Sequence, residues 1–283
     1  MKKKIINSLM LLMATLFTTI SHAQEQRIIS LGSAITETIY GLGLGDHMLA
    51  TDVTSVSPKA AANLPRVSKN RSVSAEGILT FKPTIVLAPQ GDVPHAVIQQ
   101  IRQSGVKFYA IKQDYSEKGA LKFIQDIADA LEVSALGKTV VNRTKLSLAN
   151  VSTVVKEELK NKKTPKVLFI YARGTGTMSV AGKGSSLDAM ITLAGGKNAI
   201  QEFSEFKPYT TEALVQANPD IILMFDFGAS SLGGLEAILK MPGVRLTEAG
   251  KNKRIVTMNP SLLVNFSTRL PEAIIELQKA FFE

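Results

Sequence analysis

Short apolar runs alternate with segments of helical periodicity in the first part of the chain. The runs at 27–31, 48–52, 84–89 and 106–111 are typical of β-strands, and helical segments at 74–79 and 95–103 lie between them. A further helix is expected after Gly32, with Ser33 or Thr36 as its N-cap. Regular alternation of strand and helix predicts a parallel α/β lobe.

The pattern from about residue 120 to residue 163 is almost continuously helical. Its second half has one face at heptad-like spacing, made by Val141, Leu148 and Val155 with the flanking Lys145, Ser152 and Leu159. The roughly 24 residues of 136–159 would form a rod of about 36 Å, enough to join two lobes. Pro165 is expected to end this helix.

Strand-like runs return at 166–172, 220–226 and 254–259, and a closing helix begins at Pro271. One segment of the first half also recurs here. SAEGILTFKPTIVL at 74–87 matches TTEALVQANPDIIL at 210–223, with a constant offset of 136 residues. A repeat of this period indicates two related lobes.

The repeat places a glutamate at the same position in both copies, Glu76 and Glu212. In each copy a Ser or Thr precedes the Glu at the start of a short helix, where the helix dipole favours a carboxylate by about 0.3–1 kcal/mol. This favourable interaction of a carboxylate with a helix N-terminus would by itself account for both glutamates. Their recurrence favours a function shared by the two lobes instead.

The first 23 residues differ from the rest of the chain. Lys2, Lys3 and Lys4 precede an apolar run of about 16 residues, and Ser21-His22-Ala23 fits a cleavage site. The run is short for a membrane span of about 20 residues, so a cleaved signal is predicted, with an uncleaved anchor as the alternative. The chain has no Cys, which excludes disulfides and a lipid-modified cysteine and fits a periplasmic protein. Its charge of +9 comes from dispersed basic residues, so nucleic-acid binding is not predicted.

The glycine-rich segment RGTGTMSVAGKGSS at 173–186 does not meet the requirements of a nucleotide-binding loop. Thr177 stands where a phosphate loop needs Gly, and Gly184 stands where Ser or Thr must follow Lys183. Ser179 occupies the third glycine position of the dinucleotide pattern. The segment follows a strand, so a flexible loop on the ligand side of the sheet is predicted.

No catalytic constellation is visible in the sequence. Of its three His residues, His22 leaves with the signal, and neither His47 nor His95 lies in a nucleophile motif. Two scattered His without Cys do not make a structural zinc site. The protein is therefore predicted not to be an enzyme and to have no intrinsic cofactor. A secreted metal-dependent enzyme with a mixed His/Asp/Glu site is the remote alternative.

Three segments carry a resemblance to one family. RIISLGSAITETIYGLG, SVSAEGILTFKPTIVLAP and VAGKGSSLDAMITLAGGKNAI resemble the periplasmic haem-binding proteins of bacterial haem-uptake ABC transporters, the HmuT/ShuT/PhuT group. The resemblance implies an α/β fold of two Rossmann-like lobes joined by a single long α-helix, with the ligand in the cleft between them. The expected boundaries are 1–23 for the signal, 24–135 for the N-terminal lobe, 136–163 for the helix and 164–283 for the C-terminal lobe.

The resemblance also implies roles for individual residues. In this class a Glu on each lobe meets Arg residues of the membrane permease, and Glu76 and Glu212 occupy these positions. The haem-binding group typically has Gly-Tyr-x-Arg before SAEG, with Tyr as the axial iron ligand. This chain has Ser68-Lys69-Asn70-Arg71, so Arg71 is retained and Lys69 replaces the ligand. A charged lysine suits a propionate better than iron.

Iron, if bound, then needs another ligand. His95 is one candidate, although a solvated loop His is the commoner case. Tyr171 and Met178 are weaker candidates, because Tyr171 is more often the end of a buried strand and Met178 more often a packing residue. Arg173 and Lys183 would pair with an anionic ligand or be ordinary exposed charges.

The leading hypothesis is a monomeric periplasmic binding protein that delivers haem to an ABC permease in the inner membrane. The alternative ligand is a ferric siderophore or cobalamin, since the basic residues Lys69 and Arg71 would also suit an anionic chelate.

Overall fold

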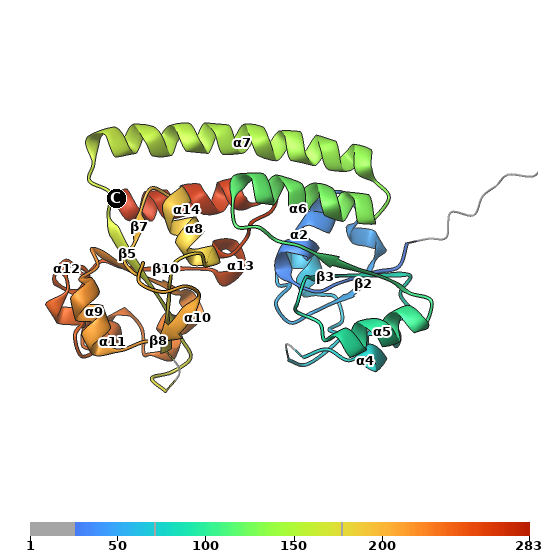
Figure 1. Cartoon of the computed structure of the whole chain (residues 1–283), viewed down its shortest axis with the longest axis horizontal. Coiled ribbons are helices and arrows are strands. Elements are labelled where there is room, and N and C mark those ends of the chain that lie inside the picture. Colours follow the sequence, from blue (N-terminus) through green and yellow to red (C-terminus); the bar gives the residue numbers. More distant parts are fainter. Residues whose placement is uncertain (1–25, 71, 177) are drawn as a thin grey trace, which may run out of the picture.

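The computed structural model describes residues 26–70, 72–176 and 178–283. These residues form two lobes that lie side by side, each around its own β-sheet, with the long helix α7 (Ser134–Asn161) along one side of both (Figure 1). The predicted architecture of two α/β lobes joined by one long helix is confirmed. The predicted signal at 1–23 and Arg71 lie outside the described residues.

The N-terminal lobe contains a four-stranded parallel sheet in the order β2-β1-β3-β4. Its strands are β1 (Ile28–Ser30), β2 (Met48–Thr51), β3 (Ile85–Pro89) and β4 (Lys107–Ile111). Its helices are α2 (Ser33–Gly41), the 3₁₀ turn η2 (Gly45–His47), α3 (Lys59–Ala62), α4 (Ala75–Leu79), α5 (His95–Gln103) and α6 (Glu117–Ala130). All four strands and the two central helices predicted from the apolar pattern are present.

Both faces of this sheet are covered, because successive residues of a strand point to opposite sides. Leu87 of β3 belongs to the cluster that contains Phe123 of α6 on one face. Its neighbour Val86 belongs to the cluster that contains Ile78 of α4 and Ile101 of α5 on the other face. The strands are therefore held rigidly, and their carboxyl ends are left to carry the loops that can bind a ligand.

The C-terminal lobe has a mixed sheet in the order β10-β9-β5-β6-β8, with β7 also paired to β5. Its strands are β5 (Lys166–Ala172), β6 (Met178–Ala181), β7 (Lys197–Asn198), β8 (Phe206–Pro208), β9 (Ile221–Phe225) and β10 (Ile255–Met258). Its helices are α8 (Ser186–Leu193), α9 (Thr211–Ala217), α10 (Asp226–Ser231), α11 (Leu235–Leu239), η3 (Val244–Leu246), α12 (Glu248–Lys251), α13 (Pro260–Leu263) and α14 (Leu270–Phe282).

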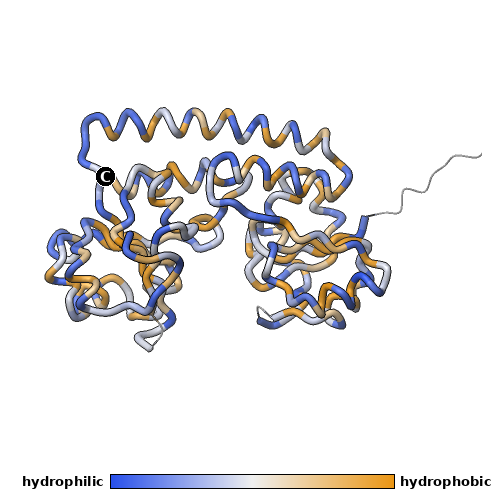
Figure 2. The backbone as a smooth tube through the Cα atoms, viewed as in Figure 1, coloured by the Kyte–Doolittle hydropathy of each residue, from blue (hydrophilic) through white to orange (hydrophobic). Residues whose placement is uncertain are grey.

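The helix α7 packs against α6 of the first lobe and α14 of the second. Its 28 residues give a length of about 42 Å. Hydrophobic and hydrophilic positions alternate along it (Figure 2), and its inner face buries Val140, Leu148 and Val155. Within the described parts of the chain, neither α7 nor another helix is long and apolar enough to cross a membrane.

Two details of the predicted α7 were wrong. Lys145 is exposed, because the buried face passes through Thr144 instead. The helix ends at Asn161, where Lys162 turns into extended backbone, so Pro165 lies beyond its end and does not stop it.

The predicted side-chain cap of α2 was also wrong. The N-cap is Gly32, whose φ of 94° lies in the region that favours glycine. Ser33 is the first helical residue, and Thr36 lies inside the helix. The hydroxyl of Thr36 is instead shared with the hydroxyls of Ser30 and Ser55, each 2.7 Å away.

The glycine-rich segment 173–186 contains a strand that the sequence analysis missed. Within it, β6 pairs antiparallel with β5, with Val180 opposite Ile170. This strand has only four residues, too few for its period-two alternation to be recognised beside several glycines. The result is a hairpin at the end of β5, which replaces the flexible loop predicted there.

Candidate functional site

The candidate ligand site lies where the two lobes face each other. In the C-terminal lobe, α10 follows β9 directly and lies on the side nearer the first lobe; in the N-terminal lobe, β4 leads to α6 on the side nearer the second (Figure 1). The rings of Tyr115 and Phe266 meet edge to face across this boundary, with centroids 5.2 Å apart. The carboxyl ends of the parallel strands, where open α/β sheets bind ligands, thus carry the side chains of interest.

Three aromatic rings gather at the strand ends of the C-terminal lobe. Phe225, the last residue of β9, stacks on Phe227 with centroids 5.4 Å apart. Tyr171, near the end of β5, stands edge-on to both rings at 6.2 and 6.0 Å. Phe225 is 8% exposed and belongs to the core, so the partly buried rings of Tyr171 and Phe227 form the apolar surface that a flat, aromatic ligand could contact.

Arg173 places a positive charge next to this aromatic cluster. Its Nε donates a hydrogen bond of 2.7 Å to the phenol oxygen of Tyr171, and its guanidinium carbon lies 5.5 Å from the ring centroid of Phe227. A hydrogen bond from a charged guanidinium is shorter and stronger than one between neutral groups. Phenolate oxygen is a recognised protein ligand of haem iron. The structure therefore brings Tyr171 and Arg173 into direct contact, both being candidates from the sequence.

Met178 lies beside this pair, but its contacts do not indicate a role of its own. It is opposite Ala172 in the β5–β6 hairpin and is partly buried against the apolar cluster of Leu168 and Ile170. Packing therefore accounts for its position. Lys183, beyond the hairpin, is exposed and donates its backbone N–H to the carbonyl of Phe203.

The basic turn of the first lobe is an exposed loop. Asn70 organises it by accepting hydrogen bonds from the backbone N–H of Ser72 at 2.9 Å and the hydroxyl of Ser68 at 3.2 Å. Lys69 is exposed between them. No described contact joins Lys69 to the cluster around Tyr171, so its predicted role toward an anionic ligand stays a prediction.

His95 is the first residue of α5 and is exposed, directly after Pro94. Among the described residues there is no group of three or more His, Cys, Asp or Glu side chains able to hold a metal ion. The predicted ligand role of His95 stays a prediction.

Glu76 and Glu212 occupy equivalent positions in the two lobes. Ser74 caps α4 by accepting the N–H of Gly77 at 3.1 Å, and Thr210 caps α9 by accepting the N–H of Ala213 at 3.1 Å. Both glutamates are exposed in the first turn of these helices. In Figure 1, α4 and α9 both lie on the side of their lobes that is remote from α7.

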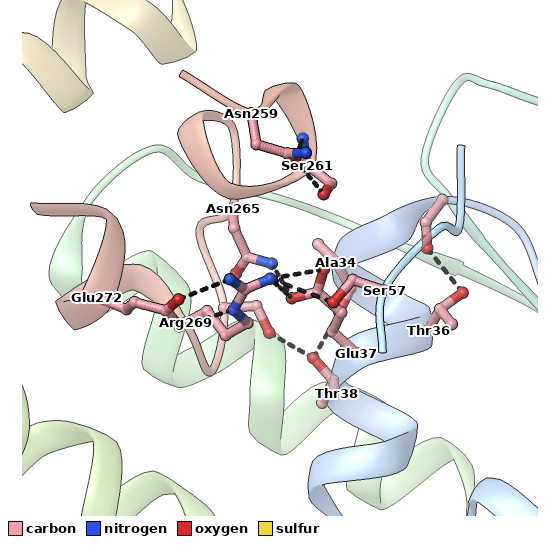
Figure 3. A network of polar contacts seen from close by, with 12 residues as sticks. Ala34, Thr36, Glu37, Thr38, Ser57, Asn259, Ser261, Asn265, Arg269 and Glu272 are labelled. Carbon is pink, nitrogen blue, oxygen red and sulfur yellow. Dashed lines mark hydrogen bonds and ion pairs between the residues drawn. The ribbon is translucent and has the colours of Figure 1, made fainter. Parts of the chain in front are cut away.

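A buried polar network joins the lobes near the first turns of α2 (Figure 3). Glu37 is 5% exposed and accepts a hydrogen bond of 2.7 Å from Nδ2 of Asn265. Arg269 approaches both carboxylate oxygens of Glu37, at 3.4 and 3.5 Å, and donates to Ser57 Oγ at 3.2 Å. Beside them, the hydroxyls of Thr38 and Ser267 are hydrogen-bonded.

The burial of Glu37 is the main influence on the protonation of this network. Desolvation raises the pKa of Glu37 to about 7, although the charge and hydrogen bonds of Arg269 oppose the shift. Arg269 itself stays charged, because its bidentate contact with Glu272, at 2.7 Å for each bond, raises its pKa further. The same contact lowers the pKa of Glu272.

Several residues of this region were not predicted from the sequence. Phe225 is the last residue of β9, and Phe227, Tyr115 and Gln113 follow the carboxyl end of a strand. That position was the available signal, because it is where ligands bind in this type of sheet.

Two α/β lobes joined by one helix, with aromatic and cationic side chains at their strand ends, define a two-lobed binding protein. The sequence profile of the periplasmic binding protein family matches residues 28–262, and the chain belongs to this family.

Individual relatives agree with this assignment. The periplasmic haem-binding protein RhuT of Roseiflexus sp. RS-1 has a structure with a TM-score of 0.86 and 33% identity, covering 91% of this chain and 98% of its own. The structure of the periplasmic haem-binding protein HutB of Vibrio cholerae has a TM-score of 0.80 and 29% identity, covering 92% of this chain and 100% of its own. The vitamin B12-binding protein of Vibrio parahaemolyticus is 26% identical over 98% of this chain and 97% of its own. The predicted resemblance to periplasmic haem-binding proteins is confirmed.

Proposed function

We propose that this protein binds haem between its lobes and delivers it to an ABC permease, with the phenolate of Tyr171 as an axial ligand of the ferric iron. The observation that carries the proposal is the 2.7 Å hydrogen bond from Arg173 to the phenol oxygen of Tyr171. It provides both an iron ligand and a group that holds its negative charge. The partly buried ring of Phe227, stacked on the buried ring of Phe225, supplies an apolar surface for the macrocycle.

Tyr171 suits ferric iron better than the other predicted candidates. His95 is exposed at the start of a helix, and Met178 is accounted for by packing. Lys69 and Arg71 are assigned to the propionates, since an ammonium and a guanidinium favour carboxylates. His95 is assigned to the second axial position from the opposite lobe.

The proposal includes export. The lysine-led apolar segment at 1–23 acts as a cleaved signal, and the remaining chain works as a monomer in the periplasm. Family membership and the haem-binding relatives support this placement.

Titration of the purified chain with haemin tests the ligand. We expect a 1:1 complex with a shifted Soret band and a charge-transfer band typical of tyrosinate-bound ferric haem. His95→Ala should alter the Soret position without abolishing binding. An unchanged spectrum for this variant would remove His95 from the axial position.

Cobalamin is the second candidate ligand, favoured by the vitamin B12-binding relative that matches 98% of the chain. A competition titration with cyanocobalamin distinguishes the two. We expect no displacement of haemin at a tenfold excess of cyanocobalamin. Binding of cyanocobalamin together with failure to bind haemin would replace haem by cobalamin as the cargo.

Glu76 and Glu212 are assigned to docking on Arg residues of the permease. Replacing both with Ala should lower haem transport by about tenfold or more, because each lost carboxylate leaves an interfacial cation unpaired. Haemin affinity should not change. Growth on haem as sole iron source, in cells that carry the cognate permease, measures transport. Exposed glutamates elsewhere, Glu157 and Glu276, provide a matched double Ala control. A loss of haemin affinity in the Glu76/Glu212 variant would place these carboxylates in the ligand site instead.

A further inference from the structure

The basic turn around Lys69 lies at one edge of the sheet in the N-terminal lobe. Thr51, the last residue of β2, forms a parallel bridge with Arg66, and the chain then runs past the end of the strand into this turn. The strand order is β2-β1-β3-β4, so β2 and β4 are about 14 Å apart at the usual spacing of neighbouring strands. The positive charge of Lys69 is therefore placed at the β2 edge, on the side where open α/β sheets bind ligands.

A hollow of about 530 Å³ opens toward the opposite edge, at the carboxyl ends of β3 and β4. Two segments line it: Pro89, Gln90, Gly91 and Asp92 from the end of β3 onward, and Ile111, Lys112, Gln113 and Tyr115 from the end of β4 onward. The ligand side of this lobe thus has the basic turn at one end and this hollow at the other.

The charged groups at the hollow are net negative. Lys112 has its ammonium 2.9 Å from Asp114 in an exposed ion pair, so its charge is largely balanced. Asp92 also lines the hollow and has interactions of its own. Burial, followed by the charges of Asp92 and Glu205, raises the pKa of Tyr115, so the exposed carboxylate of Glu205 reaches this place from the other lobe. An acid group of a ligand would be repelled here.

Tyr115 gives the same hollow an uncharged aromatic surface. The residue is 45% exposed, and its ring meets the buried ring of Phe266 edge to face. Phe266 belongs to the core cluster against which Tyr171 and Phe227 also pack. The exposed part of Tyr115 is therefore held at the boundary of the lobes by a rigid core, and its raised pKa keeps the phenol neutral at physiological pH. A fixed, half-exposed ring is a suitable contact for the apolar edge of a flat ligand.

We propose that the N-terminal lobe orients an amphiphilic macrocycle, with the uncharged edge of the cargo packed on Tyr115 and its acid groups turned to the basic turn around Lys69, away from Asp92 and Glu205. The inference rests on the proposed function, for which the cargo is haem. Both propionates of haem lie on one edge of the macrocycle, so a single orientation suits both ends of the sheet. Glu205 is then a specificity-determining residue, which rejects tetrapyrroles that carry acid groups on every edge.

The test of orientation compares protoporphyrin IX with coproporphyrin, which carries an acid group on each pyrrole ring, by fluorescence titration of the purified chain. Neither probe contains iron, so binding does not need a metal ligand. We expect the wild type to bind coproporphyrin at least about tenfold more weakly, because every orientation places an acid group against like charges. Glu205→Gln should tighten coproporphyrin by about two- to fivefold, as for the removal of one exposed charge, and leave protoporphyrin IX unchanged.

Glu236→Gln is the matched control for the change of charge. Glu236 is exposed on α11, which lies on the side of the C-terminal lobe that faces away from the N-terminal lobe (Figure 1). This variant should discriminate between the two porphyrins like the wild type.

Two substitutions of Tyr115 test the aromatic contact. Tyr115→Ala should weaken protoporphyrin IX by about three- to tenfold, because the ring that covers the apolar edge is lost. Tyr115→Phe keeps the ring and its contact with Phe266, so it should bind like the wild type. Thermal unfolding of the apo variants checks that both are folded. An unchanged affinity in Tyr115→Ala would remove this residue from the ligand site.

The outcomes separate the orientation from the iron assignment. Equal affinities of the wild type for the two porphyrins, or unchanged discrimination in Glu205→Gln, overturn the orientation. If such a chain still gives a tyrosinate band with haemin, the role of Tyr171 stands. Discrimination that depends on Glu205, in a chain whose haemin spectrum lacks that band, supports the orientation and overturns the role of Tyr171. A wild type that binds neither haemin nor protoporphyrin IX overturns both proposals.

Discussion

Tyr171→Phe is expected to abolish the tyrosinate charge-transfer band and to weaken haemin binding by at least about 100-fold. Removing a residue that only hydrogen-bonds to a metal ligand costs about 10–100-fold in metal affinity, and Tyr171 is assigned as a ligand of the iron itself. The ring and its contacts with Phe225 and Phe227 remain in the variant, so only the oxygen is lost. Absorption and resonance Raman spectra of the haemin complex measure the change.

Arg173 provides an internal check on this assignment. Arg173→Ala leaves the phenol in place but removes its hydrogen-bond donor, so affinity should fall by about 10–100-fold with a shifted charge-transfer band. Tyr40→Phe, in α2 of the other lobe, is the matched control and should bind like the wild type. A Tyr171→Phe variant with the wild-type spectrum would show that another residue holds the iron.

The fold was largely predictable because local signals and the repeat agreed. Ser74 and Thr210 cap their helices in the same way, and the strands β3 and β9 follow at the same offset. Such signals are contained in a few neighbouring residues. The strand β6 was missed for the opposite reason, since its four residues are held in place by β5 and β8 rather than by their own pattern.

The candidate site was predicted only in part. Tyr171 and Arg173 are two residues apart, and both were candidates, but their hydrogen bond depends on side-chain orientation that no sequence pattern shows. Phe227 joins them from a segment more than fifty residues away. The contact between Tyr115 and Phe266 links the two lobes and is set by how they pack.

The polar contacts between the lobes around Glu37 were also not predicted from the sequence, and they affect how stability depends on pH. Glu37 lies on α2 and contacts Asn265 and Arg269, which belong to the segment before α14. Its buried carboxyl has its pKa raised from 4.5 to about 7. Between these two values the folded protein binds more protons than the unfolded chain, so the free energy of unfolding falls as pH rises.

We therefore expect Glu37 to cost the apo protein about 3 kcal/mol of stability between pH 4.5 and pH 7, at about 1.4 kcal/mol per pKa unit. Above about pH 8 its contribution should be constant. Urea unfolding of the wild type and Glu37→Gln across this range measures the effect. The variant should lack this part of the pH dependence and be more stable than the wild type at pH 8, because a neutral amide replaces a buried charge while Arg269 keeps Glu272.

Glu276→Gln, an exposed substitution on α14, controls for the loss of one acidic residue and should keep the wild-type pH dependence.

Arg269→Ala removes the cationic partner of Glu37 in the C-terminal lobe. It leaves Glu37 buried without its cation, so the variant should lose about 3–5 kcal/mol at pH 8 and less at pH 5, where Glu37 is neutral. Equal losses at both pH values would show that Arg269 acts through packing and Glu272 alone. A larger loss at pH 8 would show that the charge of Glu37 couples the two lobes near neutral pH.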